Sequence, residues 1–150
     1  MEKQYGKLTL GGATFELDSI NSTGIIVSES DEYDDTIIIS FFMDFEKGVF
    51  NGEEVTPVID INDHETRKSG ISELVGEVYS VDSPEEADER EDTLYIYEHE
   101  PFEKYSLKIL EVSGEMVHIS IEGTAITDGY LEPYQTADFS GDLWLKWQMM

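Results

Sequence analysis

Apolar and polar side chains alternate most regularly in the segment 105–124. Its second half follows the order Val117, His118, Ile119, Ser120, Ile121, Glu122. This period of two predicts a β-strand with one buried face and one solvent-facing side. Residues 105–112 alternate in the same way, and Ser113-Gly114 between the two halves offers a residue that readily takes the positive φ of a tight turn. We therefore expect a β-hairpin here, on which the other strands assemble.

Shorter apolar runs predict further strands along the rest of the chain. They cover residues 7–10, 13–17, 24–27, 36–43, 49–55, 58–61, 71–81, 93–97 and 139–147. The run 36–43 is apolar on both faces, which is typical of a central strand. Asn51-Gly52 is a strong signal for a hairpin turn. The polar segment 60–69 is expected to form a loop or one helical turn.

One short acidic helix is expected near residues 84–90. Ser83 can cap its N-terminus, Pro84 suits its first turn, and Glu86 completes a capping box. The strands number about nine or ten, at the spacing typical of sandwiches and barrels, and no long helical period alternates with them. The sequence therefore predicts a single all-β domain over residues 1–150, either an antiparallel β-sandwich or a β-barrel.

The formal net charge of −25 is the most unusual property of the chain, because 34 Asp and Glu are balanced by only nine Lys and Arg. Such a field repels nucleic acids and anionic membranes, and it attracts cations and basic proteins. We therefore expect a basic protein as the partner, with no nucleic acid and no membrane bound. The alternative is a structural β-domain whose acidity serves solubility.

Two segments concentrate the carboxylates. Segment 28–35 is expected to be an exposed loop between two strands, and segment 82–92 contains the short helix. Their candidate partner-binding residues are Glu29, Asp31, Glu32, Asp34, Asp35, Glu85, Glu86, Asp88 and Glu89. Dense surface clusters of one sign steer an oppositely charged partner, and they raise its association rate more than its affinity. A solvated surface without a partner is the alternative for both segments.

Three aromatic residues near the end of the chain are further candidates for binding. The alternation in 139–147 places Trp144 on the polar side of its strand, and Tyr130 and Tyr134 lie in the loop before it. Together they could form a platform that stacks against sugar rings, or a hot spot for a protein partner. The alternative is that they form a second small core or lie flat on the sheet surface.

Candidate patterns for catalysis and metal binding are weak. Cysteine is absent, which excludes disulfides, thiolate chemistry and Cys-based zinc sites. His64 and His99 each lie between two carboxylates, but adjacent strand residues point to opposite faces. Only residues from separate strands, such as His99 and His118, could therefore share a metal ion. The acidic loops lack EF-hand spacing, and no nucleophile motif is present. We expect no cofactor, no metal site and no enzyme activity.

The N-terminal residues contain no apolar core of a signal peptide, and no run approaches the roughly 20 apolar residues that span a bilayer. We therefore expect a cytoplasmic protein. In overall character the chain resembles the immunity proteins of bacterial toxin systems, which are small, acidic, cysteine-free and without a catalytic motif. Those proteins bind a toxin domain, often a basic nuclease, and block it.

This resemblance implies a non-catalytic protein that docks on a basic toxin domain and neutralises it. A related possibility is a DNA mimic that occupies a DNA-binding protein. A second hypothesis is a carbohydrate or small-ligand binding β module. A third is an enzyme built on the barrel or sandwich, which would need an internal pocket lined by paired carboxylates or histidines.

Overall fold

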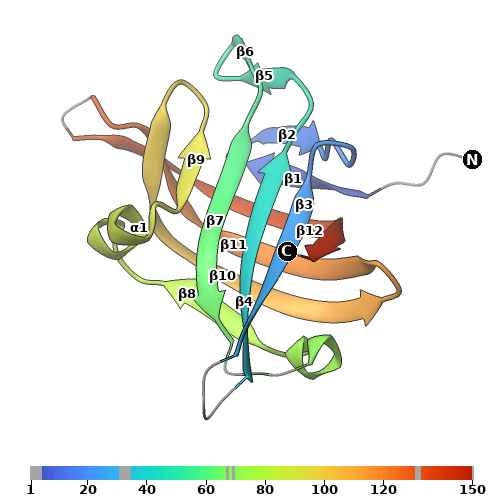
Figure 1. Ribbon diagram of the computed structural model, residues 1–150. Coiled ribbons are helices and arrows are strands. Elements are labelled where there is room, and N and C mark those ends of the chain that lie inside the picture. The colour runs from blue at the N-terminus through green and yellow to red at the C-terminus, as the bar shows by residue number, and fades with distance from the viewer. Residues whose placement is uncertain (1–4, 31–34, 67, 69, 131–132, 150) are drawn as a thin grey trace, which may run out of the picture.

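The chain folds into a barrel in this computed structural model. The structure describes residues 5–30, 35–66, 68, 70–130 and 133–149, and of residues 28–30, 35, 36 and 149 it describes only the backbone. Within these residues, seven strands close into a mixed β-barrel with extra strands around it and one short α-helix (Figure 1). The predicted all-β class is confirmed, and of the two predicted architectures the barrel is the one observed.

Twelve strands are found in the described part of the chain. The first six are β1 (Gly6–Leu10), β2 (Ala13–Glu16), β3 (Thr23–Ser30), β4 (Asp35–Asp44), β5 (Gly48–Phe50) and β6 (Glu53–Val55). The others are β7 (Val58–Glu65), β8 (Val78–Val81), β9 (Thr93–Tyr95), β10 (His99–Ser113), β11 (Met116–Asp128) and β12 (Gln135–Met149). A 3-10 helix, η1 (Ile71–Leu74), precedes β8, and α1 (Pro84–Arg90) follows it.

The barrel runs in the order β11-β10-β9-β7-β4-β3-β12, and pairing of β12 with β11 closes it. Strands β1 and β2 extend the sheet from β12, β8 pairs with β10, and β5 and β6 form a separate hairpin. All of these pairings are antiparallel except β3 with β12, which is parallel. The predicted antiparallel pairing is therefore found at every pair except this one. Alternation of side chains reports which face is buried but carries no information on strand direction.

The predicted hairpin is the longest element of the barrel. Strands β10 and β11 pair from Phe102 to Met116, around a turn in which Gly114 has a φ of +60°. The alternating apolar residues of β11 point inward and are almost completely buried. The hairpin expected at Asn51-Gly52 is also present, as the turn between β5 and β6.

The barrel interior is packed with aliphatic and aromatic side chains from nearly every strand. Its largest fully buried members are Phe15, Phe41, Phe45, Phe102, Leu8, Leu10, Ile26, Ile39, Met43, Ile59, Ile61 and Leu74. Burial of this apolar surface provides the main stabilisation of the fold.

Two predicted strand segments differ from the structure. Residues 71–81 form a strand only from Val78 onward, because 71–74 adopt the 3-10 helix and Gly76 has a φ of +91°. Leu74 alone of the 3-10 helix is buried. Conversely, β7 is longer than predicted: it extends to Glu65, into the polar segment 60–69 that was expected to be a loop or one helical turn.

The short acidic helix lies where it was predicted. The Ser83 hydroxyl accepts a hydrogen bond from the backbone N–H of Glu86 at 3.2 Å, and Pro84 occupies the first turn. The helix ends at Glu91, whose φ of +60° places it in the left-handed region. Ala87 packs into the core and so fixes which face of the helix is solvent-exposed.

Candidate functional site

The acidic helix is attached to the barrel by a buried polar network. Strand β9 lies between β7 and β10 but pairs with only three residues of each. Beyond the end of β9, β7 and β10 are therefore not joined by a strand among the described residues. Asp92, which is 0% exposed, bridges them. Its carboxylate accepts hydrogen bonds from the Tyr105 hydroxyl at 2.6 Å, from Arg90 Nε at 2.9 Å and from the backbone N–H of Asn62 at 2.7 Å. Three donors stabilise this buried charge.

His64 extends the network into the barrel. Its Nε2 lies 2.7 Å from the Tyr105 oxygen. Because the Tyr105 hydroxyl donates to Asp92, we assign the proton to His64 Nε2, which donates to Tyr105. Burial lowers the pKa of His64 to about 4, and Arg90 acts in the same direction. The imidazole is therefore neutral near pH 7, and the network carries one buried anion that Arg90 neutralises.

Arg90 also connects the helix to an irregular part of β7. Its Nη2 donates to the carbonyl oxygens of Asn62 and Asp63, the latter at 3.2 Å. These two residues lie at a bulge opposite Ser40, whose hydroxyl donates to Asp63 Oδ1 at 3.0 Å. Because Asp92, His64 and Tyr105 at its centre are buried, we assign the network a structural role: it anchors α1 to the barrel wall.

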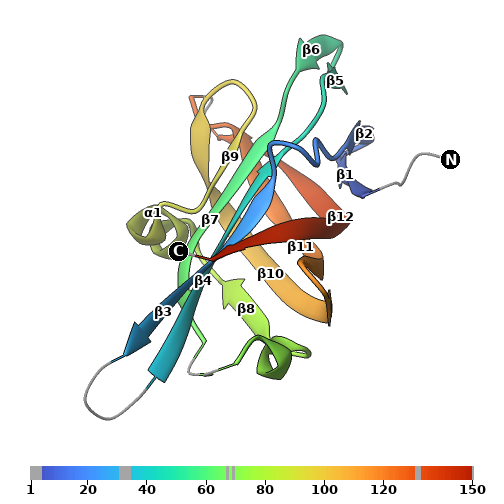
Figure 2. The ribbon, with the colours of Figure 1, turned by 45° about the vertical axis from the view of Figure 1, so that its right-hand side comes forward.

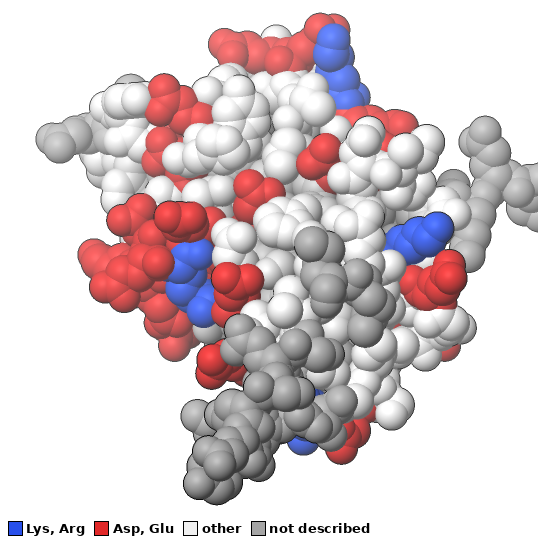
Figure 3. Space-filling model, viewed as in Figure 1, with Lys and Arg blue, Asp and Glu red and all other residues white. Residues whose placement is uncertain are grey.

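The carboxylates of α1 face solvent. Glu85, Glu86, Asp88 and Glu89 are all exposed. Figure 3 shows acidic side chains gathered densely over the region of α1, with a basic side chain beside them. The structure thus gathers the second predicted cluster on one rigid, exposed element.

The first predicted cluster lies mostly beyond the described residues. Glu29 and Asp35 belong to the paired ends of β3 and β4, where only the backbone is described. Asp31, Glu32 and Asp34 lie outside the described residues. The far ends of β3 and β4 project from the barrel and are separate from α1 in both ribbon views (Figures 1 and 2). The parts of the backbone that carry the two acidic clusters therefore do not lie side by side.

The three candidate aromatic residues are not brought together. Tyr134 precedes β12 and Trp144 lies ten residues further along it, a distance of roughly 33 Å at the usual rise of an extended strand. Trp144 is half-buried and stacks on His118, with ring centroids 4.5 Å apart and planes 11° apart. Tyr130 is 76% exposed and donates to Glu98 at 2.6 Å. A shared platform of all three is therefore not formed.

A different acidic and aromatic cluster forms at one end of the barrel, and we call it the barrel-end cluster. It joins the β5–β6 hairpin, the segment 97–100 that leads into β10, and the end of β11 with the two residues after it. Its members are Glu53, Tyr97, Glu98, Glu100, Asp128 and Tyr130. Within the described part of the chain, none of its four carboxylates lies within 4 Å of a Lys or Arg nitrogen.

Burial, hydrogen bonding and repulsion from neighbouring carboxylates raise the pKa values of three members of the barrel-end cluster. Burial raises the pKa of Glu100, and the charges of Glu98 and Asp128 raise it further. Burial also raises the pKa of Tyr97, and the nearby charge of Glu53 raises it further. The hydrogen bond to Glu98 raises the pKa of Tyr130. A cation placed here would relieve this repulsion.

Only part of the barrel-end cluster could be recognised from the sequence. Glu98 and Glu100 flank His99 in the sequence, but Glu53 and Asp128 come from distant segments. Gly129 permits the close approach, because a Cβ there would lie 2.2 Å from a Glu100 carboxylate oxygen. Such convergence depends on the closed barrel and not on local spacing.

No group of three or more His, Asp or Glu that could hold a metal ion occurs among the described residues. In the same residues, no helix is long and apolar enough to cross a membrane. No protein-family model, curated protein or solved structure matches the chain.

Proposed function

We propose that this chain is a non-catalytic binding protein that docks on a basic protein and neutralises it, in the manner of an immunity protein for a nuclease-type toxin domain. The supporting observation is the barrel-end cluster, where four carboxylates without basic partners among the described residues surround two exposed tyrosines. Tyrosine is enriched at binding hot spots, and carboxylates complement Lys and Arg.

The helix α1 adds a second acidic surface to the proposal. The network around Asp92 anchors the C-terminal end of the helix that carries these exposed carboxylates, so little backbone entropy is lost when a partner docks. At long range, the net charge of −25 would steer a basic partner toward the chain.

The experiment begins with co-expression of the tagged protein and the products of the genes that flank its own, followed by washing at low and then high salt. A stoichiometric basic protein that is retained, and inactive until released, is the expected result. Retention of nothing at low salt would contradict the proposal and favour the alternative that the acidity serves solubility.

Charge-reversal variants then locate the interface. We expect Glu98→Lys to slow association several-fold and to reduce its dependence on salt, because surface charges act over about 8 Å at physiological ionic strength. Glu115→Lys is the matched control. It makes the same change of charge at an exposed position in the turn of the β10–β11 hairpin, at the other end of β10 from Glu98. Equal effects of the two substitutions would show that net charge alone matters and that the barrel-end cluster is not the interface.

The pair Glu85→Lys and Glu89→Lys tests α1 in the same assay. If these substitutions slow association while Glu98→Lys does not, the interface lies on the helix and the role given to the barrel-end cluster is wrong.

A further inference from the structure

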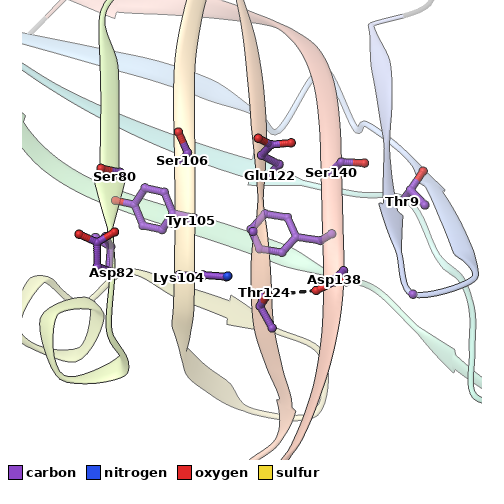
Figure 4. Close-up of a pocket in the computed structure, with 14 residues that line it drawn as sticks. Thr9, Ser80, Asp82, Lys104, Tyr105, Ser106, Glu122, Thr124, Asp138 and Ser140 are labelled. Atoms are coloured by element: carbon purple, nitrogen blue, oxygen red, sulfur yellow. Dashed lines mark hydrogen bonds between the residues drawn. The ribbon is translucent and has the colours of Figure 1, made fainter.

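The outer face of strands β10, β11 and β12 is hollowed between the flanking strands β8 and β1. A surface cavity of about 600 Å³ lies there (Figure 4), and a second of about 300 Å³ adjoins it. Thr9, Glu122 and Ser140 line both cavities, so the two form one continuous depression, which we call the polar groove.

Cross-strand register places a line of polar side chains along the groove. Each is paired with the next in the order Ser80, Ser106, Glu122, Ser140, Thr9. Five strands at the usual spacing of about 4.8 Å give this line a length of roughly 19 Å. A second line runs beside it through Lys104, Thr124 and Asp138.

Large buried residues behind the groove make its floor solid. Gly123 leaves no room for a side chain, because a Cβ there would lie 2.2 Å from the carbonyl oxygen of Lys104. On the inner side its neighbours across the sheet are Tyr105 and Phe139, both buried. A ligand would therefore rest on the groove without entering the barrel.

The charged side chains of the groove do not neutralise one another. Lys7 faces Asp142 in register, yet in the described part of the chain neither Lys7 nor Lys104 lies within 4 Å of a carboxylate oxygen. Glu122 likewise forms no ion pair there. These donors and acceptors consequently remain open to a ligand.

This combination of groups selects a class of ligand. Hydroxyl side chains both donate and accept, carboxylates accept from neighbouring hydroxyl groups, and the two lysines donate. A nucleic acid or polyanion is disfavoured because Asp82, Glu122, Asp138 and Asp142 outnumber Lys7 and Lys104. A peptide cannot add a strand within the floor of the groove, because β10, β11 and β12 are paired on both edges at this point.

We propose that the polar groove binds a neutral, linear oligosaccharide. Each sugar unit carries several hydroxyl groups that donate and accept, as the groove requires along its whole length. The structure also provides a reporter, since Asp142 lines the groove and pairs with His118, which stacks on Trp144. Neither the barrel-end cluster nor α1 takes part.

The test is a titration of the whole chain with cellohexaose, maltohexaose, xylohexaose and chitohexaose, followed by amide NMR and by tryptophan emission. We expect one of these glycans to shift the amides of Ser106, Glu122 and Ser140 saturably, with a Kd of about 1 mM or tighter. The emission of Trp144 should change in parallel. If none of the four shifts these amides at about 10 mM, the groove is only a solvated sheet surface and the proposal is overturned.

Two variants locate the binding. Ser140→Leu places a bulky apolar side chain where the two cavities join and should weaken binding at least about tenfold. Its matched control is Ser113→Leu, at an exposed position at the far end of β10. Glu122→Gln keeps the shape and removes one charge, and it should weaken binding about tenfold even if the leucine variant does not fold. Unchanged binding by a folded Ser140→Leu or by Glu122→Gln would refute the proposal. Because no protein partner is present in the titration, its outcome does not affect the proposed inhibitor function.

Discussion

Tyr105→Phe is the substitution that most directly tests the buried network. It removes one oxygen and preserves the ring, which packs against Phe102 at a centroid distance of 5.3 Å. The lost hydroxyl donates to Asp92 at 2.6 Å and accepts from His64 at 2.7 Å. His64 Nε2–H is then left without a partner in a buried site, and Asp92 retains two donors, Arg90 and the backbone of Asn62.

The expected cost follows from these contacts. A buried donor without an acceptor costs about 1–3 kcal/mol, and hydrogen bonds to charged groups contribute about 1.5–3 kcal/mol. Because Asp92 keeps its other donors, we expect a total loss of about 2–3 kcal/mol in the free energy of unfolding. For a domain of this size, each kcal/mol lowers Tm by about 2–4 °C, so the Tm should fall by roughly 5–10 °C.

Tyr130→Phe is the matched control. It removes the same oxygen, which also donates to a carboxylate at 2.6 Å, but at a residue that is 76% exposed. Urea unfolding followed by far-UV circular dichroism gives the free energy of unfolding for both variants, and an unchanged m-value would show that the unfolded states are comparable. We expect no measurable change for Tyr130→Phe. If Tyr105→Phe costs no more than this control, the network does not stabilise the barrel and the argument fails.

Three further predictions concern pH, backbone space and salt. The pKa of His64 is about 4 in the folded chain, below its ordinary value of 6.5, so the unfolded chain binds the extra proton first and the free energy of unfolding falls as pH drops from about 6.5 to 4. Urea unfolding at several pH values should show a smaller fall for His64→Gln. An equal fall in both proteins would contradict the assignment of a buried, neutral His64. Gly123→Ala should lower the free energy of unfolding by at least about 2 kcal/mol, because the new Cβ would meet the Lys104 carbonyl oxygen. Gly12→Ala, where nothing lies within 4 Å of the new Cβ, should change it by no more than about 0.5 kcal/mol. Calorimetry should show Tm rising with added NaCl, because salt screens the self-repulsion of a chain of net charge −25; a falling Tm would indicate that ion pairs dominate.

Local patterns in the sequence predicted the elements whose causes are themselves local. The alternation around Val117, the turn at Asn51-Gly52 and the cap at Ser83 each depend on residues that are close in sequence. In contrast, the parallel pairing of β3 with β12 depends on how far β12 continues beyond β1. No short window of sequence contains that information.

The candidate site shows the same limit. The exposure of Glu85 and Glu89 could be predicted, because a charged helix turns its carboxylates toward water. The meeting of Glu53 with Tyr97, and of Glu98 with Tyr130, could not be predicted, because each pair joins segments that only the closed barrel brings together. The three aromatic residues do not form a shared platform, because Trp144 lies ten positions beyond Tyr134, which precedes β12, and the extended backbone carries the two apart.

Strand β12 pairs with β11 over residues 135–146, with β1 over residues 139–143 and with β3 over residues 146–149. Strands formed early in synthesis therefore lack this neighbour until residues 135–149 have been made and have emerged from the ribosome. At typical rates of about 5–20 residues per second, β1 would wait several seconds for its partner. During that time the edges of β1, β3 and β11 are unprotected. The high negative charge of the nascent chain would then discourage premature association between neighbouring copies.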